Sequence, residues 1–219
     1  MDEDLSTLAE AVAYLRSTVP QQLQLGQELL ATDPEHPLPS DLAIPGLVQR
    51  SIMLTSGFAT MVEECNPVCA LPLIRMHLDN CMRLFAFMLA EHPHAVLKAY
   101  LEDIPLSRLR SKDGAALTDS YLHRELSKTF PWVSGAYKIA SGSVHFSRPG
   151  MLSAWAHSDD SQRTVYFQVG VDGGRVWSLE ERKDAVETFT GTTRVFVRVL
   201  ASMRAAKQRL SAGEDHAPE

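Results

Sequence analysis

Apolar residues recur at steps of three and four along most of the chain, and this period constrains the fold more than any other feature. Leu8, Val12, Leu15 and Val19 form the first such series. Residues at this spacing share one face of an α-helix. The same period predicts helices at about residues 5–31, 41–64, 70–91, 95–100, 118–127, 130–147 and 178–210. The sequence therefore predicts a mainly all-α protein, a helical bundle.

Proline and capping residues place the ends of these helices. Three prolines lie in the segment 32–40, which cannot continue the first helix because proline removes a hydrogen-bond donor and clashes with the preceding turn. Thr7-x-x-Glu10 and Ser178-x-x-Glu181 have the pattern of a capping box. We therefore expect a capping box near the start of the first helix and another that opens the last helix.

A small β-hairpin is expected just before the C-terminal helix. Two β-prone runs, 164–169 and 175–177, flank a glycine-rich turn and predict a hairpin at about residues 163–177. Because a lone two-stranded hairpin is only marginally stable, we expect it to pack on the helices. With 219 residues, 45% of them hydrophobic, the chain is expected to form a single helical domain, 1–212, followed by a frayed tail, 213–219.

Charge and composition exclude several classes of protein. The net charge of −6 and the pI near 5.7 argue against a dedicated DNA-coating protein. The first ten residues are acidic and lack the features of a secretion signal. The most apolar stretch, 67–90, contains Arg75, Asp79 and Arg83, charges that are costly inside a bilayer. We therefore expect a cytoplasmic protein with no membrane partner.

The three cysteines do not predict a disulfide framework or a metal centre. Cys65, Cys69 and Cys81 are odd in number and lie within 17 residues, and no second ligand pair completes a zinc site. We expect a reducing compartment, no bound metal and no cofactor.

Charged side chains on the central helix form the first candidate site. Arg75, Asp79 and Arg83 are spaced four apart and share one face, so Asp79 can reach either guanidinium. They form either a salt-bridge ladder or the anion-binding part of a site. His77 falls on the apolar stripe, where we expect a hydrogen-bonded core histidine.

The second candidate site is a polar row on the helix at 130–147. Tyr137, Ser141 and His145 are also spaced four apart, and Lys138 lies on a neighbouring face. A phenol, a hydroxyl and an imidazole in one row can relay protons or hold a phosphate. The alternative interpretation is a polar seam that satisfies its own hydrogen bonds between two helices.

The third feature is the basic C-terminal helix. Its second half has no acidic residue and carries five cations: Arg194, Arg198, Arg204, Lys207 and Arg209. Such cations complement the helix dipole on a solvated face, or they contact phosphates; Arg194 and Arg198 are the candidate phosphate contacts.

Two segments, LPLIRMHLDNCMRLFAF at 71–87 and YKIASGSVHFS at 137–147, carry a family resemblance. The chain resembles a family of helical microbial proteins with an Arg and an acid four residues apart on a central helix and a Tyr…Ser…His pattern on a later one. That family is similar to HEPN-type bundles of toxin–antitoxin and phage-defence systems, many of them metal-independent RNases and some only nucleotide binders. The resemblance implies roles for the matching positions Arg75, Asp79, Tyr137, Ser141 and His145. HEPN nucleases carry Arg-x(4–6)-His, whereas here Lys138, not an arginine, stands at comparable spacing.

Three functions follow as hypotheses. The first is a HEPN-like ligand-binding or protein-interaction module of a stress or defence system, with a phosphate-bearing ligand held by the polar row. The second is a metal-independent endoribonuclease acting on RNA, with His145 as general acid or base, Tyr137 positioning the phosphate, and Arg75 or Lys138 stabilising the phosphorane. A homodimer that brings two copies of His145 into one cleft would favour it. The third is a purely structural subunit.

Overall fold

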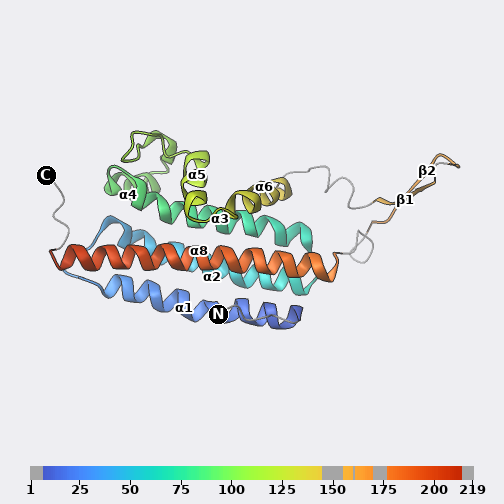
Figure 1. Ribbon diagram of the computed structural model, residues 1–219, viewed down its shortest axis with the longest axis horizontal. Helices are drawn as coiled ribbons and strands as arrows, with labels where there is room; N and C mark the ends of the chain where they lie inside the picture. Colours follow the sequence, from blue (N-terminus) through green and yellow to red (C-terminus); the bar gives the residue numbers. More distant parts are fainter. Residues whose placement is uncertain (1–6, 145–154, 160, 170–176, 214–219) are drawn as a thin grey trace.

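The computed structural model describes residues 7–144, 155–159, 161–169 and 177–213. In this part of the chain it contains seven α-helices, one 3₁₀-helix and one two-stranded antiparallel sheet (Figure 1). The helices are α1 (Leu8–Ala31), α2 (Pro39–Glu63), α3 (Pro67–Leu89), α4 (Pro93–Leu101), η1 (Leu106–Arg108), α5 (Asp119–Thr129), α6 (Val133–Val144) and α8 (Leu179–Ser211). The strands are β1 (Trp155–Asp159) and β2 (Thr164–Phe167). The predicted fold class, a mainly helical bundle with a hairpin before the C-terminal helix, is confirmed.

Four long helices form the bundle. α1 packs against α2 and α8, and α3 packs against the same two helices, so α1 and α3 lie at opposite corners. The shorter α5 and α6 cover the outer side of α3, as Figure 1 shows. None of the helices in the described ranges is long and apolar enough to cross a membrane. The stretch predicted to be a central helix is α3, and its Leu78 and Leu84 are fully buried.

Both predicted capping boxes are present. The hydroxyl of Thr7 accepts from the backbone N–H of Glu10, whose carboxylate accepts from the backbone N–H of Thr7. Ser178 and Glu181 form the same pair at the start of α8. α2 and α3 begin two or three residues earlier than predicted, because each has a proline at its first position, where the missing N–H costs nothing.

A stack of three rings joins α2, α3 and α8 in the core. Phe189 of α8 lies between Phe58 of α2 and His77 of α3, with ring centroids 4.2 Å and 4.8 Å away. His77 is fully buried, and its Nε2 lies 3.1 Å from the hydroxyl of Thr193. The predicted hydrogen-bonded core histidine is therefore confirmed. Burial, with a smaller effect of the charge on Arg50, lowers the pKa of His77 to about 3.

The strand that pairs with β2 in the structure was not predicted from the sequence. The run at 164–167 is a strand, and it pairs with β1, which precedes it. Trp177 lies outside both strands, two residues before α8. Its side chain is 8% exposed and belongs to the core. Residues 170–176 lie outside the described residues. The second run of the predicted hairpin, 175–177, falls largely on those residues, so the pairing predicted for 163–177 stays a prediction beside the observed pair of β1 and β2.

A turn at Asp159 connects β1 to β2. The carboxylate of Asp159 accepts hydrogen bonds from the backbone N–H groups of Ser161, at 2.9 Å, and Gln162, at 3.2 Å. Aspartate favours turns because its side chain can bind the backbone two residues on. The hairpin also does not pack on the helices as expected, since Phe167 is 64% exposed and Figure 1 shows both strands beyond the end of the bundle.

The buried His77 predicts a specific dependence of stability on pH. Its pKa is about 3 in the folded chain and near 6.5 when unfolded. Between these values the unfolded chain binds the extra proton, so this residue lowers the free energy of unfolding as the pH falls below about 6.5, by up to ~1.4 kcal/mol per pH unit. Urea unfolding of the wild type and His77→Gln between about pH 7.5 and 5 should show a shallower fall in the variant. Equal slopes would contradict the buried, neutral imidazole.

Candidate functional site

Arg75 of α3 and Tyr137 of α6, both predicted site residues, are in direct contact. A terminal nitrogen of Arg75 donates to the Tyr137 hydroxyl at 2.8 Å, and the guanidinium carbon lies 4.1 Å from the centre of the ring. Only 17% of the Arg75 side chain is exposed. The phenol therefore holds this cation both through its hydroxyl and through its π-face.

Asp79 belongs to an ionic ladder beside this pair. It contacts Arg83 at 2.8 Å and Arg50 at 3.6 Å. Arg83 also contacts Asp119 of α5 at 2.7 Å, and Arg75 lies 4.0 Å from the same carboxylate. Burial lowers the pKa of Arg83, but Asp79 and Asp119 outweigh it and raise that pKa above its usual value. Asp79 thus neutralises Arg83, while Arg75 has only a distant acidic neighbour in the described part of the chain.

His123 of α5 also lies beside Tyr137, and it is not among the residues predicted from the sequence. Its ring centre lies 4.3 Å from that of Tyr137, and its Nε2 lies 3.4 Å from the hydroxyl of Ser127. Burial and then the charge of Arg75 lower the pKa of His123 below the usual value. The periodic Leu122 and Leu126 located this helix in the sequence, but only its packing beside α6 brings His123 to Tyr137.

The other members of the polar row are not assembled in the described residues. Ser141 is half-buried on α6, and no hydrogen bond between the described residues joins it to Tyr137. Lys138 is exposed. His145 lies outside the described residues. We name Arg75, Tyr137 and His123 the Arg–Tyr–His cluster.

The cations of the C-terminal helix α8 differ in whether they pair with acidic groups of the bundle. Arg204 pairs with Glu28 of α1, and the buried Lys207 contacts Asp41 of α2 at 2.6 Å. Arg194 donates to the hydroxyl of Tyr14 at 3.0 Å. Arg198 contacts the ring of Phe130, 5.9 Å from its centroid, and makes no ion pair within the described part of the chain. Arg204 and Lys207 therefore bind acidic groups of the bundle, whereas Arg198 has no acidic partner in the described part of the chain.

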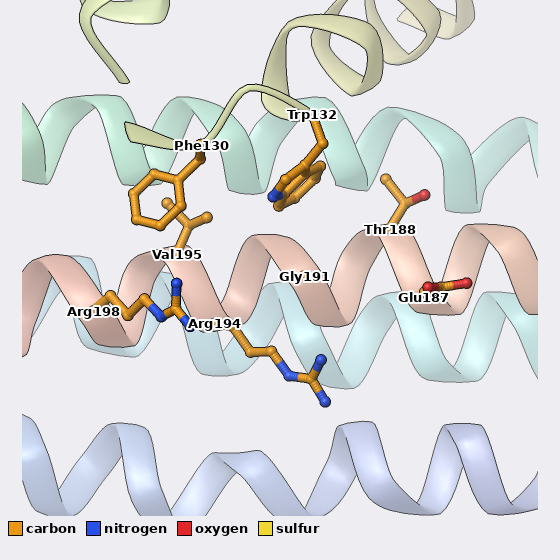
Figure 2. A pocket seen from close by; sticks show the side chains of 8 residues that line it. All are labelled: Phe130, Trp132, Glu187, Thr188, Gly191, Arg194, Val195 and Arg198. Carbon is orange, nitrogen blue, oxygen red and sulfur yellow. The ribbon is translucent and has the colours of Figure 1, made fainter. Parts of the chain in front are cut away.

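A cleft of about 400 Å³ lies on α8 beside Arg198. It is lined by Phe130, Trp132, Glu187, Thr188, Gly191, Arg194, Val195 and Arg198 (Figure 2). The two aromatic residues come from the segment between α5 and α6, and the other six come from one face of α8. The predicted phosphate contacts Arg194 and Arg198 are thus both part of the cleft.

Gly191 determines how closely Trp132 approaches α8. A Cβ atom at this position would lie 3.1 Å from Cη2 of Trp132. Figure 2 shows the indole directly above the glycine. Trp132 is nevertheless 42% exposed, so the helix covers part of the ring and leaves another part to the cleft.

The two ends of the cleft carry opposite charge. Arg198 lies at one end and Glu187 at the other, with Trp132 between them, as Figure 2 shows. Within the described residues Glu187 has no hydrogen-bond or ion-pair partner. Both charged groups are therefore available to a ligand that lies along the cleft.

No family model, curated protein or solved structure matches the chain.

The contact between Gly191 and Trp132 yields a prediction. Gly191→Ala should displace the indole, because the new Cβ would lie too close to it. We expect a red shift of tryptophan fluorescence and stronger quenching by acrylamide. Gly46→Ala is the matched control: it lies in α2, and nothing lies within 4 Å of its added Cβ. It should raise the free energy of unfolding by up to ~1 kcal/mol without changing the fluorescence. Identical spectra for both variants would contradict the close approach.

Proposed function

We propose that the protein is a binding module that holds a phosphate-bearing ligand in the cleft between Trp132 and α8. The observation that carries the proposal is Arg198, an exposed guanidinium with no acidic partner in the described residues, beside two aromatic side chains. This role agrees with the HEPN-like binding module of a stress or defence system that the sequence suggests. It places the ligand at the cleft and not at the polar row of α6.

Arginine suits this ligand for a geometric reason. Its planar guanidinium presents five donors and can bind two phosphate oxygens at once. Arg194 and Arg198 are four residues apart, so they project from the same side of α8. The bond from Arg194 to Tyr14 uses one donor and leaves others for a ligand. Arg198 is thus the main candidate for the anion, and Arg194, one turn away, is a second donor on the same side of the helix.

The composition of the cleft favours binding over catalysis. The eight described residues that line it include no histidine, cysteine or lysine, and Glu187 is their only proton acceptor of carboxylate type. General acid–base work is performed most often by histidine. The cleft offers instead a flat apolar wall and fixed charges, which are features of recognition.

Isothermal titration calorimetry with ribose 5-phosphate and inorganic phosphate tests this proposal. Arg198→Gln should weaken binding about 10- to 100-fold, because it removes hydrogen bonds between charged groups worth ~1.5–3 kcal/mol. Arg108→Gln makes the same change of charge at an exposed arginine of η1 and should bind like the wild type. If the wild type binds neither compound, or both variants lose affinity equally, the proposal fails.

The Arg–Tyr–His cluster supports a second candidate, the metal-independent endoribonuclease. The specific observation is the contact of His123 with Tyr137, which itself binds Arg75. Since burial and Arg75 lower the pKa of His123, its imidazole is neutral at pH 7 and able to accept a proton. His123 would act as the general base, while Arg75 would stabilise the charged phosphorane.

Cleavage of a labelled RNA mixture in the presence of EDTA tests this candidate. His123→Asn should lower the rate about 100-fold or more, the usual contribution of a general base. The wild-type rate should rise with pH through an apparent pKa below the ordinary value for histidine, 6.5. His94→Asn changes an exposed histidine outside the cluster and should cleave normally. His145→Ala tests the residue predicted from the sequence. No cleavage by the wild type would exclude the candidate for these RNAs.

A further inference from the structure

The charged ends of the cleft lie in line along α8. Glu187 and Arg198 are eleven positions apart, which corresponds to about three turns and a separation of ~16 Å along the helix axis. At 3.6 residues per turn the two positions point within about 20° of each other. A single elongated ligand can therefore contact both groups. Such a ligand is anionic at the end near Arg198 and donates hydrogen bonds at the end near Glu187.

The middle of the cleft presents a flat aromatic surface. Trp132 lies against the backbone at Gly191, where no side chain separates them, and the exposed part of its indole faces the cleft. Phe130 extends the apolar wall toward Arg198. Stacking of a nucleic-acid base on an aromatic side chain is worth ~1–3 kcal/mol and occurs with every base. A nucleoside phosphate fits this order of contacts.

A carboxylate such as that of Glu187 can distinguish among the bases by the hydrogen bonds that it accepts. A carboxylate only accepts hydrogen bonds, and its two oxygens bind best to two adjacent N–H donors. On the Watson–Crick edge, guanine alone among the four common bases has two such donors, N1–H and the 2-amino group. Adenine and cytosine present a ring nitrogen acceptor beside their amino group, and uracil places its N–H between two carbonyl groups.

We infer that the cleft selects guanosine phosphates, with the base on Trp132, its Watson–Crick edge at Glu187 and the phosphate at Arg198 and Arg194. This inference rests on the proposed function of the same cleft. The shared chemistry is a guanosine phosphate unit, either as a free nucleotide or as one residue of single-stranded RNA.

Calorimetric titration of the full chain with GMP, IMP, AMP and ribose 5-phosphate tests the inference. GMP should bind about tenfold or more tightly than AMP, since it gains charge-assisted hydrogen bonds. IMP, which keeps N1–H but lacks the 2-amino group, should fall between them. Glu187→Gln should abolish the preference for GMP over AMP. Asp184→Asn removes an exposed carboxylate one turn earlier, outside the cleft lining, and should keep the preference.

Two further experiments determine where the base binds and whether the ligand is a free nucleotide or part of an RNA. Quenching of tryptophan fluorescence by GMP should be lost in Trp132→Leu, which places the base on this indole. A single-stranded RNA with one guanosine, compared with the same RNA in which adenosine replaces it, distinguishes a nucleotide within RNA from a free one. Tighter binding of the guanosine RNA than of both GMP and the adenosine RNA assigns the site to RNA and supports guanine selection, whereas equal binding of the two RNAs would overturn it.

The outcomes separate the two claims. If no phosphate compound binds, the proposed function fails and the inference with it. If ribose 5-phosphate, AMP and GMP bind with equal affinity, the phosphate-binding function stands and guanine selection is overturned. A preference for GMP that persists in Glu187→Gln would also overturn the inference, because it would assign recognition of the base to another group.

Discussion

The stack of Phe189 between Phe58 and His77 fixes the rotation of α8, and the cleft depends on that rotation. At about 100° per residue, Arg198 lies roughly half a turn away from Phe189, and Gly191 lies close to the same outer side. Burying the phenylalanine therefore presents the opposite face of the helix to the segment that carries the aromatic wall. A slip of one residue in this packing would turn the arginine by about 100° and separate it from the wall.

The basic residues of α8 have two different roles: some form ion pairs within the bundle, and Arg198 faces the cleft. Lys207 is buried against Asp41, and that carboxylate also accepts from the backbone N–H of Leu38 at the start of α2. Removing one partner of such a pair leaves an uncompensated buried charge, which typically costs ~3–5 kcal/mol. Lys207 therefore acts in stability, whereas the exposed Arg198 contributes no ion pair to the fold in the described residues. The sequence shows only a run of cations, because the acidic partners come from α1 and α2, more than a hundred residues away.

Features encoded by neighbouring residues were predictable, and those that depend on tertiary packing were not. The capping boxes at Thr7 and Ser178 located the starts of α1 and α8 because the cap and its partner are three residues apart. The strand at 164–167 was also evident from the sequence. Its partner was not, because a strand can pair with a run on either side of it, and here the turn at Asp159 joins it to β1. Spacing placed Asp79 within reach of Arg83, as the structure shows. It could not reveal His123, which belongs to another helix, or Trp132, whose importance depends on a glycine about sixty residues later.

The cleft and the Arg–Tyr–His cluster share one short segment of chain. Trp132 contacts α8, whereas Tyr137, five residues later, contacts Arg75 of α3. A change that displaces Trp132 can therefore also move the start of α6 and disturb the cluster. Arg198 and His123 lie outside this segment: the guanidinium of Arg198 comes from α8 and His123 comes from α5. These two residues separate the candidate functions cleanly: loss of phosphate binding without loss of cleavage assigns the cleft, and the reverse assigns the cluster.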